Sequence, residues 1–257
     1  MTRLAAQGIT LGYDDRVVVD SLDVEILEGK VTTVVGANAC GKSTLLRGLA
    51  RLLRPSAGAV LLDDRPLDEL STIEVARVMG VLPQTPVAPD GITVGDLVGR
   101  GRHPHQVWFR RWTDDDEVAV ADALEATGTQ DLVARPLREL SGGQRQRVWV
   151  AMALAQQTDV LLLDEPTTYL DLNHQVELLR LLRELNARSG KTIVIVLHEL
   201  NLAARFSDHM IAMADGRIVA QGTPGEVVTS DLVHEVFGLE CLVVTDPVAG
   251  TPLVVPL

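Results

Sequence analysis

The sequence predicts an α/β fold built on a mainly parallel sheet. Two strand-like runs, 160–163 and 192–197, flank a segment with helical spacing at 172–188. Strand, helix and strand in this order form a βαβ unit, whose two strands run parallel in one sheet. A third run, 31–35, is β-branched throughout, as expected of a strand that is covered on both faces. We therefore expect a doubly covered parallel sheet.

The helix of this unit carries its own start and stop signals. Val176, Leu179 and Leu182 recur at helical spacing. Asp171 is suited to capping the N-terminus, and Gly190 is suited to ending the helix.

The N-terminal part predicts a separate antiparallel β subdomain. Residues 17–19 and 22–26 are β-branched runs separated by Asp20 and Ser21, and we expect two antiparallel strands. The strand at 31–35 then leads through a glycine-rich loop into a helix at 45–53, ended by Pro55 and Gly58.

Residues 86–157 have a helical pattern with breaks and predict an inserted helical subdomain. Thr113 precedes the acidic run 114–117, which is typical of a capped and solvated helix start rather than of a metal site. After residue 197, the runs 210–213 and 218–220 predict a hairpin around Asp215 and Gly216. The pattern recurs in the tail, at 241–244 and 252–255.

Composition restricts the function classes. The 257 residues are 46% hydrophobic and 23% charged, which indicates a globular chain, and the net charge of −12 argues against nucleic acid as a partner. Two cysteines cannot form a disulfide scaffold, so we expect a reduced, intracellular protein. No apolar run approaches the roughly 20 residues of a spanning helix, and the N-terminus does not resemble a signal peptide.

A phosphate-binding loop follows the strand at 31–35. The segment fits G-x-x-x-x-G-K-[ST], in which glycines let backbone N–H groups surround phosphate oxygens and a helix N-terminus points at the anion. We expect Lys42 to neutralise the β and γ phosphates and the Ser43 hydroxyl to bind Mg²⁺. The predicted contacts are Gly36, Ala37, Asn38, Ala39, Cys40, Gly41, Lys42, Ser43 and the following Thr44.

Two carboxylates end the strand at 160–163. Carboxyl ends of parallel strands border the crevice where such sheets bind ligands. Asp164 can hold Mg²⁺, directly or through water, and Glu165 can deprotonate the attacking water. His198 directly follows the next strand, where a lone histidine is more often a structural hydrogen-bonding residue, and Gln84 alone would be a loop amide.

A second anion-binding helix end is predicted at residues 140–144, LSGGQ, which open a helix at 144–157. A simple helix cap also explains it. One ATP needs one phosphate loop, so a head-to-tail dimer, in which this terminus covers the partner's ATP, accounts for both features.

Six features follow one another along the chain: the phosphate loop, Gln84, LSGGQ, LLLDEP, Asp171 and His198. In this order they resemble the ATPase subunit of an ATP-binding cassette transporter, and the resemblance covers residues 2–225. The resemblance implies a P-loop NTPase core that hydrolyses ATP with Mg²⁺ bound by Ser43, Gln84 and Asp164. The implied catalytic residues are Glu165, His198, Lys42 and Gln84. It also implies that Tyr13 stacks on adenine, although a strand-end aromatic is the plain alternative. Ser141, Gly142, Gly143 and Gln144 would bind the partner's γ-phosphate, and Asp171 would lie in the loop that reaches the other subunit.

Within that family the chain resembles importers of ferric siderophores, haem and cobalamin, on the segments 36–53, 101–106, 167–172, 198–209 and 246–256. His103 and His105 suggest a surface loop rather than an iron site, because Pro104 separates them and no third ligand is near. The resemblance implies two identical subunits on a separate permease at the cytoplasmic face of the membrane, served indirectly by a substrate-binding protein. The alternatives are a soluble cassette ATPase of iron–sulfur assembly, translation or repair, and a nucleotide switch without turnover.

The expected organisation is a single domain, 1–257. Residues 1–85 and 158–225 form the ATP-binding core with the β subdomain, 86–157 the helical subdomain, and 226–257 a short extension. The aromatic and basic cluster 107–112 suits a permease interface or internal packing. Cys40 is either a reactive thiol, with its pKa lowered by the loop and Lys42, or a small space-filling residue.

Overall fold

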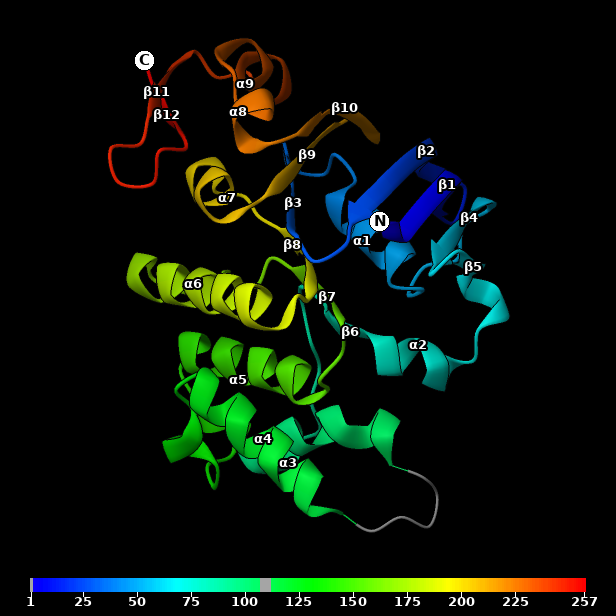
Figure 1. Ribbon diagram of the computed structural model, residues 1–257, viewed down its shortest axis with the longest axis vertical. Coiled ribbons are helices and arrows are strands. Elements are labelled where there is room, and N and C mark those ends of the chain that lie inside the picture. Colours follow the sequence, from blue (N-terminus) through cyan, green and yellow to red (C-terminus); the bar gives the residue numbers. More distant parts are fainter. Residues whose placement is uncertain (1, 107–111) are drawn as a thin grey trace.

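The computed structural model describes residues 2–106 and 112–257, and its strands form three sheets (Figure 1). The strands are β1 (Thr2–Tyr13), β2 (Arg16–Leu27), β3 (Val31–Gly36), β4 (Ala57–Leu62), β5 (Arg65–Pro66), β6 (Met79–Leu82), β7 (Val160–Asp164), β8 (Thr192–Val196), β9 (His209–Ala214), β10 (Arg217–Gly222), β11 (Cys241–Thr245) and β12 (Pro252–Pro256). Within the described residues, the central sheet has the order β10-β9-β3-β8-β7-β6, and its strands from β9 to β6 are parallel. The N-terminal sheet, β2-β1-β4-β5, and the pair β11-β12 are antiparallel.

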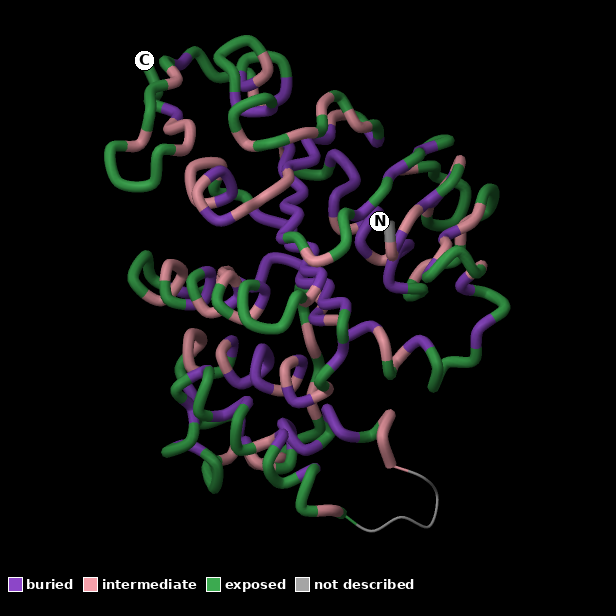
Figure 2. The backbone as a smooth tube through the Cα atoms, viewed as in Figure 1, coloured by how far each residue is buried: buried purple, intermediate pink, exposed green. Residues whose placement is uncertain are grey.

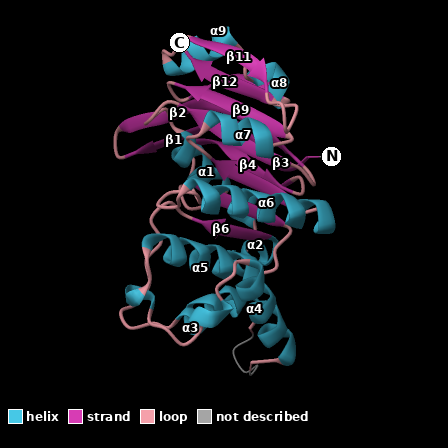
Figure 3. Ribbon diagram, turned by 90° about the vertical axis from the view of Figure 1, so that its left-hand side faces the viewer, coloured by secondary structure: helices cyan, strands magenta, loops and turns pink. Residues whose placement is uncertain are grey.

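The helices divide between the faces of the central sheet and one end of the molecule. They are α1 (Lys42–Leu49), α2 (Thr72–Val78), α3 (Val94–Gly99), α4 (Asp114–Ala126), α5 (Gly142–Ala155), α6 (Leu172–Ser189), α7 (Leu200–Phe206), α8 (Pro224–Val227) and α9 (Ser230–Phe237), with short 3-10 helices at Leu67–Glu69, Arg100–His105 (η2), Gln130–Leu132 and Leu137–Glu139. Figure 1 shows α3, α4 and α5 together at one end and the β11-β12 pair at the other. Figure 3 shows α6 and α7 over one face of the central sheet.

Two hydrophobic clusters lie on opposite faces of the central sheet, and the strands alternate between them. In β7, Leu161 and Leu163 pack with α5, α6 and α7, whereas Leu162 packs with α1 and the N-terminal sheet. Figure 2 shows the buried backbone concentrated in these central strands. Because both faces are covered, the strands read as unbroken apolar runs, and their ends are the places where polar side chains reach solvent.

The predicted βαβ unit is confirmed as β7, α6 and β8. Asp171 caps α6 by accepting the backbone N–H of His174 at 3.0 Å, and Gly190 ends the helix at φ 65°. Thr113 caps α4, and Ser141 caps α5. The hairpin turn at Asp215 and Gly216 and the pairing in the tail are also present.

The N-terminal prediction was wrong in one respect. Residues 17–19 and 22–26 belong to one strand, β2, and their partner is β1, which the sequence pattern did not predict. Ser21 has a left-handed φ of 49° beside a shift in the β1-β2 register, so the two intervening residues form a bulge rather than a turn. The helix expected at 45–53 begins earlier, at Lys42, and ends at Leu49.

No helix among the described residues combines the length and the apolar character that crossing a membrane requires.

Candidate functional site

A cleft of about 1070 Å³ opens where the parallel strands β3, β7 and β8 end. The carboxyl ends of adjacent parallel strands meet at one sheet edge, so residues far apart in sequence converge there. The cleft is lined by Tyr13, Asp14, Asp15, Arg16, Val18, Asn38, Ala39, Gly41, Lys42, Ser43, Thr44, Gln84, Glu165 and His198.

The backbone between β3 and α1 requires glycine at two positions, Gly36 and Gly41. A Cβ on Gly36 would lie 2.2 Å from the Met213 carbonyl oxygen, and Gly41 has φ 107°. The buried Lys42 ammonium donates to the carbonyl oxygens of Gly36, at 2.9 Å, and Ala37, at 2.8 Å. The lysine side chain is therefore folded back along the loop that begins α1, with its charge beside the N-terminus of that helix.

Ser43 and Asp164 form a pair of oxygen donors. The Ser43 hydroxyl donates to Asp164 Oδ1 at 2.8 Å, whereas Oδ2 of this buried carboxylate has no hydrogen-bond partner among the described residues. Burial raises the pKa of Asp164, and the Ser43 hydrogen bond opposes that effect. A buried carboxylate oxygen without a donor, beside a hydroxyl oxygen, suits a hard cation such as Mg²⁺. The donor set present fits the expected metal.

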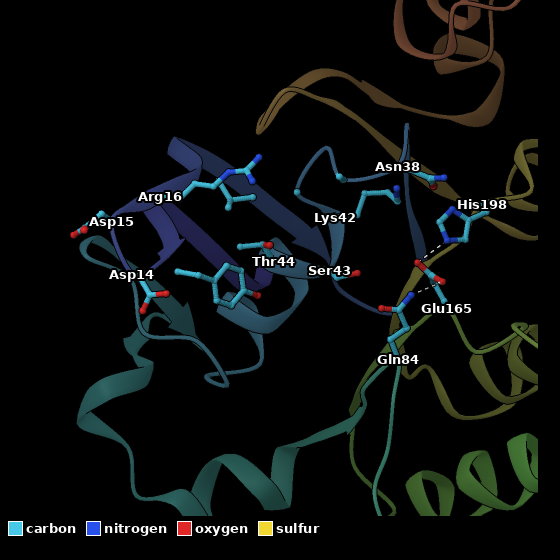
Figure 4. Close-up of a pocket in the computed structure, with 14 residues that line it drawn as sticks. Asp14, Asp15, Arg16, Asn38, Lys42, Ser43, Thr44, Gln84, Glu165 and His198 are labelled. Atoms are coloured by element: carbon cyan, nitrogen blue, oxygen red, sulfur yellow. Dashed lines mark hydrogen bonds and ion pairs between the residues drawn. The ribbon is translucent and has the colours of Figure 1, made fainter.

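Glu165 is held at both carboxylate oxygens. Oε1 lies 2.5 Å from His198 Nε2, and Oε2 accepts a hydrogen bond from Gln84 Nε2 at 2.8 Å. Figure 4 shows His198 and Gln84 reaching Glu165 from different segments, with Ser43 and Lys42 beside this group. Glu165 is buried and has a left-handed φ of 51°, an unusual conformation for a residue with a side chain. Such backbone outliers cluster at functional sites.

The structure thus brings most of the predicted site residues together, including Tyr13, which lies at the end of β1 with 41% of its surface exposed. Gly36, Ala37 and Cys40 belong to the same loop. Asp164 joins through its bond to Ser43.

A second group of predicted residues lies outside this lining, at the start of α5 and before α6. Ser141 accepts the Gln144 N–H at 3.2 Å, and the Gln144 side chain accepts the Ser141 N–H at 3.1 Å. Gly142 and Gly143 lie close to Tyr169 and Leu170, just before Asp171. In one copy of the chain, Ser141, Gly142, Gly143, Gln144 and Asp171 therefore do not line the cleft formed by the other described residues.

The surroundings of Cys40 distinguish between the two interpretations that its sequence position left open. Cys40 is buried, and that burial raises the pKa of the thiol, an effect that the nearby Lys42 charge only partly opposes. The sequence argument counted the positive charge but could not see the loss of solvation. The space-filling interpretation fits the structure.

The acidic first turn of α4 is only partly solvated, which corrects the expectation of a solvated helix start. Asp116 is 5% exposed and pairs with Arg102 Nε at 2.9 Å. Arg102 also donates to Ala155 O and Gln157 Oε1, so the pair is a buried structural link between η2, α4 and the end of α5. No group of three or more metal-ligating side chains occurs among the described residues.

His103 and His105 lie in η2 rather than in a loop, and His105 Nε2 is 2.7 Å from the Gln156 carbonyl oxygen. Of the aromatic and basic cluster at 107–112, residues 107–111 fall outside the described part of the chain.

Sequence reasoning missed two contacts at the cleft. Thr168 Oγ1 donates to Glu165 Oε2 at 3.4 Å, and Arg47 Nη1 donates to the Tyr13 hydroxyl at 3.1 Å. Position 47 was accessible to pattern analysis, because it lies four residues after Ser43 and hence on the same face of α1.

Comparison with known proteins agrees with this geometry. The family model described as ABC transporter matches residues 19–168. The ferric enterobactin transport ATP-binding protein FepC of Escherichia coli (strain K12) is 52% identical over 257 residues, which cover 100% of this chain and 95% of that relative. The cobalamin import ATP-binding protein BtuD of Halobacterium salinarum is 41% identical over 240 residues, which cover 93% of this chain and 60% of the relative.

A solved structure resembles most of this fold. The dimeric structure of MJ0796, a bacterial ABC transporter cassette, matches with a TM-score of 0.77 at 26% identity. The match covers 86% of this chain and 98% of that one.

Proposed function

This chain belongs to the ABC transporter family, and we propose that it is the ATP-hydrolysing subunit of a membrane importer that takes up an Fe(III)–siderophore through a separate permease. The cleft supports the first half of this proposal, because its residue types and contacts suit ATP and Mg²⁺. The similarity to FepC supports the second half.

ATP binding uses the loop after β3. Backbone N–H groups of residues 36–44 and the N-terminus of α1 receive the phosphates, and Lys42 leaves its carbonyl partners to neutralise the β and γ oxygens. Tyr13 stacks on the adenine. Ser43 and Asp164, with Gln84 toward the γ-phosphate, would hold Mg²⁺, and the bound ion would neutralise charge on the phosphates.

Hydrolysis uses the carboxylate of Glu165 as the general base for the attacking water. A base must be oriented before it can accept a proton efficiently, and His198 and Gln84 hold both oxygens of Glu165 in place. His198 and Gln84 then face the γ-phosphate from either side of Glu165.

A second copy completes the site. Ser141 to Gln144 carry a helix N-terminus suited to an anion but lie outside the cleft of their own chain, and Asp171 lies beside them. In a head-to-tail homodimer, this group covers the γ-phosphate bound by the partner. The MJ0796 cassette was solved as a dimer.

The chain divides this work between its segments. Residues 1–85 and 158–225 form the ATP-binding core, and 86–157 form the helical subdomain, which contacts the permease at the cytoplasmic face of the membrane. Residues 226–257 are a short extension. A substrate-binding protein acts only indirectly, on the far side of the permease, and nucleic acid is not a partner of this acidic chain.

One observation carries the cargo assignment: the similarity to FepC extends over 100% of this chain at 52% identity. Cobalamin is the second candidate because a cobalamin relative also matches, at 41% identity. Haem is the third candidate cargo, because the sequence also resembles the ATPase subunits of haem importers.

Uptake in a deletion strain tests the assignment. A strain that lacks this gene and has no second siderophore system should not take up radiolabelled iron from a siderophore, and the intact gene should restore uptake. The Glu165→Gln variant should not restore it, whereas maltose uptake serves as the control and stays normal. Persistent iron uptake with lost cobalamin uptake would move the cargo to cobalamin.

A further inference from the structure

Arg47 contacts Tyr13, the aromatic residue of the cleft, from the helix that follows the phosphate-binding loop. It lies on α1, four residues after Ser43, and is partly buried. Its Nη1 donates to the Tyr13 hydroxyl oxygen at 3.1 Å. This contact connects the N-terminal sheet to the phosphate-binding helix through two side chains.

The position of Tyr13 explains why such a contact matters. Tyr13 ends β1 and pairs with Arg16 across a tight turn, where Asp14 has a left-handed φ of 49°. With 41% of its surface exposed, the ring is not fixed by packing in a core. Among the described residues, the hydrogen bond that holds its hydroxyl is the one from Arg47.

The guanidinium of Arg47 is not committed to an acid. The described residues place no carboxylate within 4.0 Å of it, in contrast to Arg3, Arg102, Arg183 and Arg188. Among the described residues its side chain donates to the Tyr13 hydroxyl, and its charge also acts on Asp164, where it opposes the rise in pKa. An ordered side chain loses less conformational entropy when a ligand binds against it.

We propose that Arg47 is a positioning residue for nucleobase binding, which holds the Tyr13 ring in the orientation that receives adenine. This inference rests on the proposed function, because it assumes that Tyr13 meets the base of ATP. It assigns Arg47 no contact with the reacting phosphate.

A double-mutant cycle in the full-length protein tests this. Arg47→Met removes the donor while retaining the side-chain length, and Tyr13→Phe removes the acceptor while retaining the ring. Each should weaken ATP binding about 3–10-fold, as expected for the loss of one ordered side chain, and raise KM while kcat stays within about twofold. The double variant should bind ATP as weakly as either single variant, since both remove the same interaction.

A ligand without a base and two matched variants distinguish a role in base positioning from a role at the phosphates. Inorganic triphosphate lacks a base, so its affinity should stay within about twofold of the parent. Arg47→Lys should recover part of the ATP affinity, and Arg54→Met, which removes the same charge from an exposed position, should change nothing.

Two results would overturn the inference: unchanged ATP affinity in Arg47→Met, or an equal loss for ATP and triphosphate, which would mean that Arg47 acts on the phosphates. If instead the parent protein bound triphosphate and ATP equally well, Tyr13 would not read the base, and that part of the proposed function would fail.

Discussion

Two buried aspartates, one among the helices α4 and α5 and one at the end of β7, have opposite surroundings. Asp116 is 5% exposed and Asp164 is 1% exposed, so burial costs both of them solvation. Both oxygens of Asp116 have donors, from Arg102, Thr113 and the Thr113 backbone. Asp164 has one donor, Ser43, and its second oxygen has none among the described residues.

Their pKa shifts differ in direction for this reason. Burial raises the pKa of both carboxyls, but at Asp116 the hydrogen bonds and charge of Arg102 and Thr113 outweigh it, so that pKa is lowered. A carboxylate that serves the fold is satisfied inside the chain. A carboxylate left partly unsatisfied indicates a partner from outside, and in the function proposed for this cleft that partner is Mg²⁺.

The largest effect should come from the residue beside Asp164. Glu165→Gln removes the proposed general base but retains the size and one hydrogen-bonding oxygen, so ATP binding should persist while turnover falls about 10²–10⁴-fold. Trapped ATP should then hold the protein as a dimer on a sizing column. Glu184→Gln, at an exposed position on α6, should hydrolyse ATP normally. Near-normal hydrolysis by Glu165→Gln would rule out the general-base assignment.

The next largest effect should be on stability, at the other aspartate. Arg102→Met leaves Asp116 buried without its cation and should lower the free energy of unfolding by about 3–5 kcal/mol, measured by urea denaturation. Combining it with Asp116→Leu removes the unpaired charge and should recover much of the loss. If the double variant is as unstable as the single one, the pair does not behave as a buried ion pair.

The two aspartates should respond to pH with opposite signs. The lowered pKa of Asp116 gives stability that is present above the unfolded-state value, about 3.9, and is lost as pH falls through the folded-state pKa. The raised pKa of Asp164 has the opposite effect on stability. Ionisation of that carboxyl destabilises the folded protein as pH rises above about 4. Unfolding curves of Asp116→Asn and Asp164→Asn between pH 3 and 7 should therefore diverge from the parent in opposite directions. Parallel curves would contradict the two environments.

The smallest effect should be at Cys40. Because burial raises its pKa and closes access to the thiol, maleimide at neutral pH should label the folded protein slowly, and ATPase activity should survive brief treatment. Rapid labelling of Cys40 that ATP prevents would restore the reactive-thiol interpretation.

The difference between local and long-range contacts explains which features could be predicted from the sequence. The phosphate loop, the strand ends and the caps at Asp171, Thr113 and Ser141 were predictable because each is local: a few adjacent residues specify the conformation. Features that depend on contacts between distant parts of the chain could not be predicted in this way.

Strand β1 was missed because its two alanines and two glycines have low β-propensity, and pairing with β2 and β4 makes it a strand. The acidic run was expected in solvent because its partner, Arg102, precedes it by fourteen residues and reaches it only in the folded chain. The sequence left two interpretations of Cys40 open for the same reason, since desolvation is a property of the packed structure. The roles of the site residues remain predictions that the convergence of their side chains supports.

The most direct test of this account compares Asp164→Asn with Asp116→Asn in one pair of titrations. Mg²⁺ is added at fixed ATP concentration while nucleotide affinity is followed, and the free energy of unfolding is measured without nucleotide. Asp164→Asn should lose about 10–100-fold in Mg²⁺-dependent ATP affinity with no loss of stability. Asp116→Asn should retain that affinity while losing several kcal/mol of stability. Normal Mg²⁺ dependence in Asp164→Asn, or equal effects of the two substitutions on both quantities, would contradict the division between a structural and a functional carboxylate.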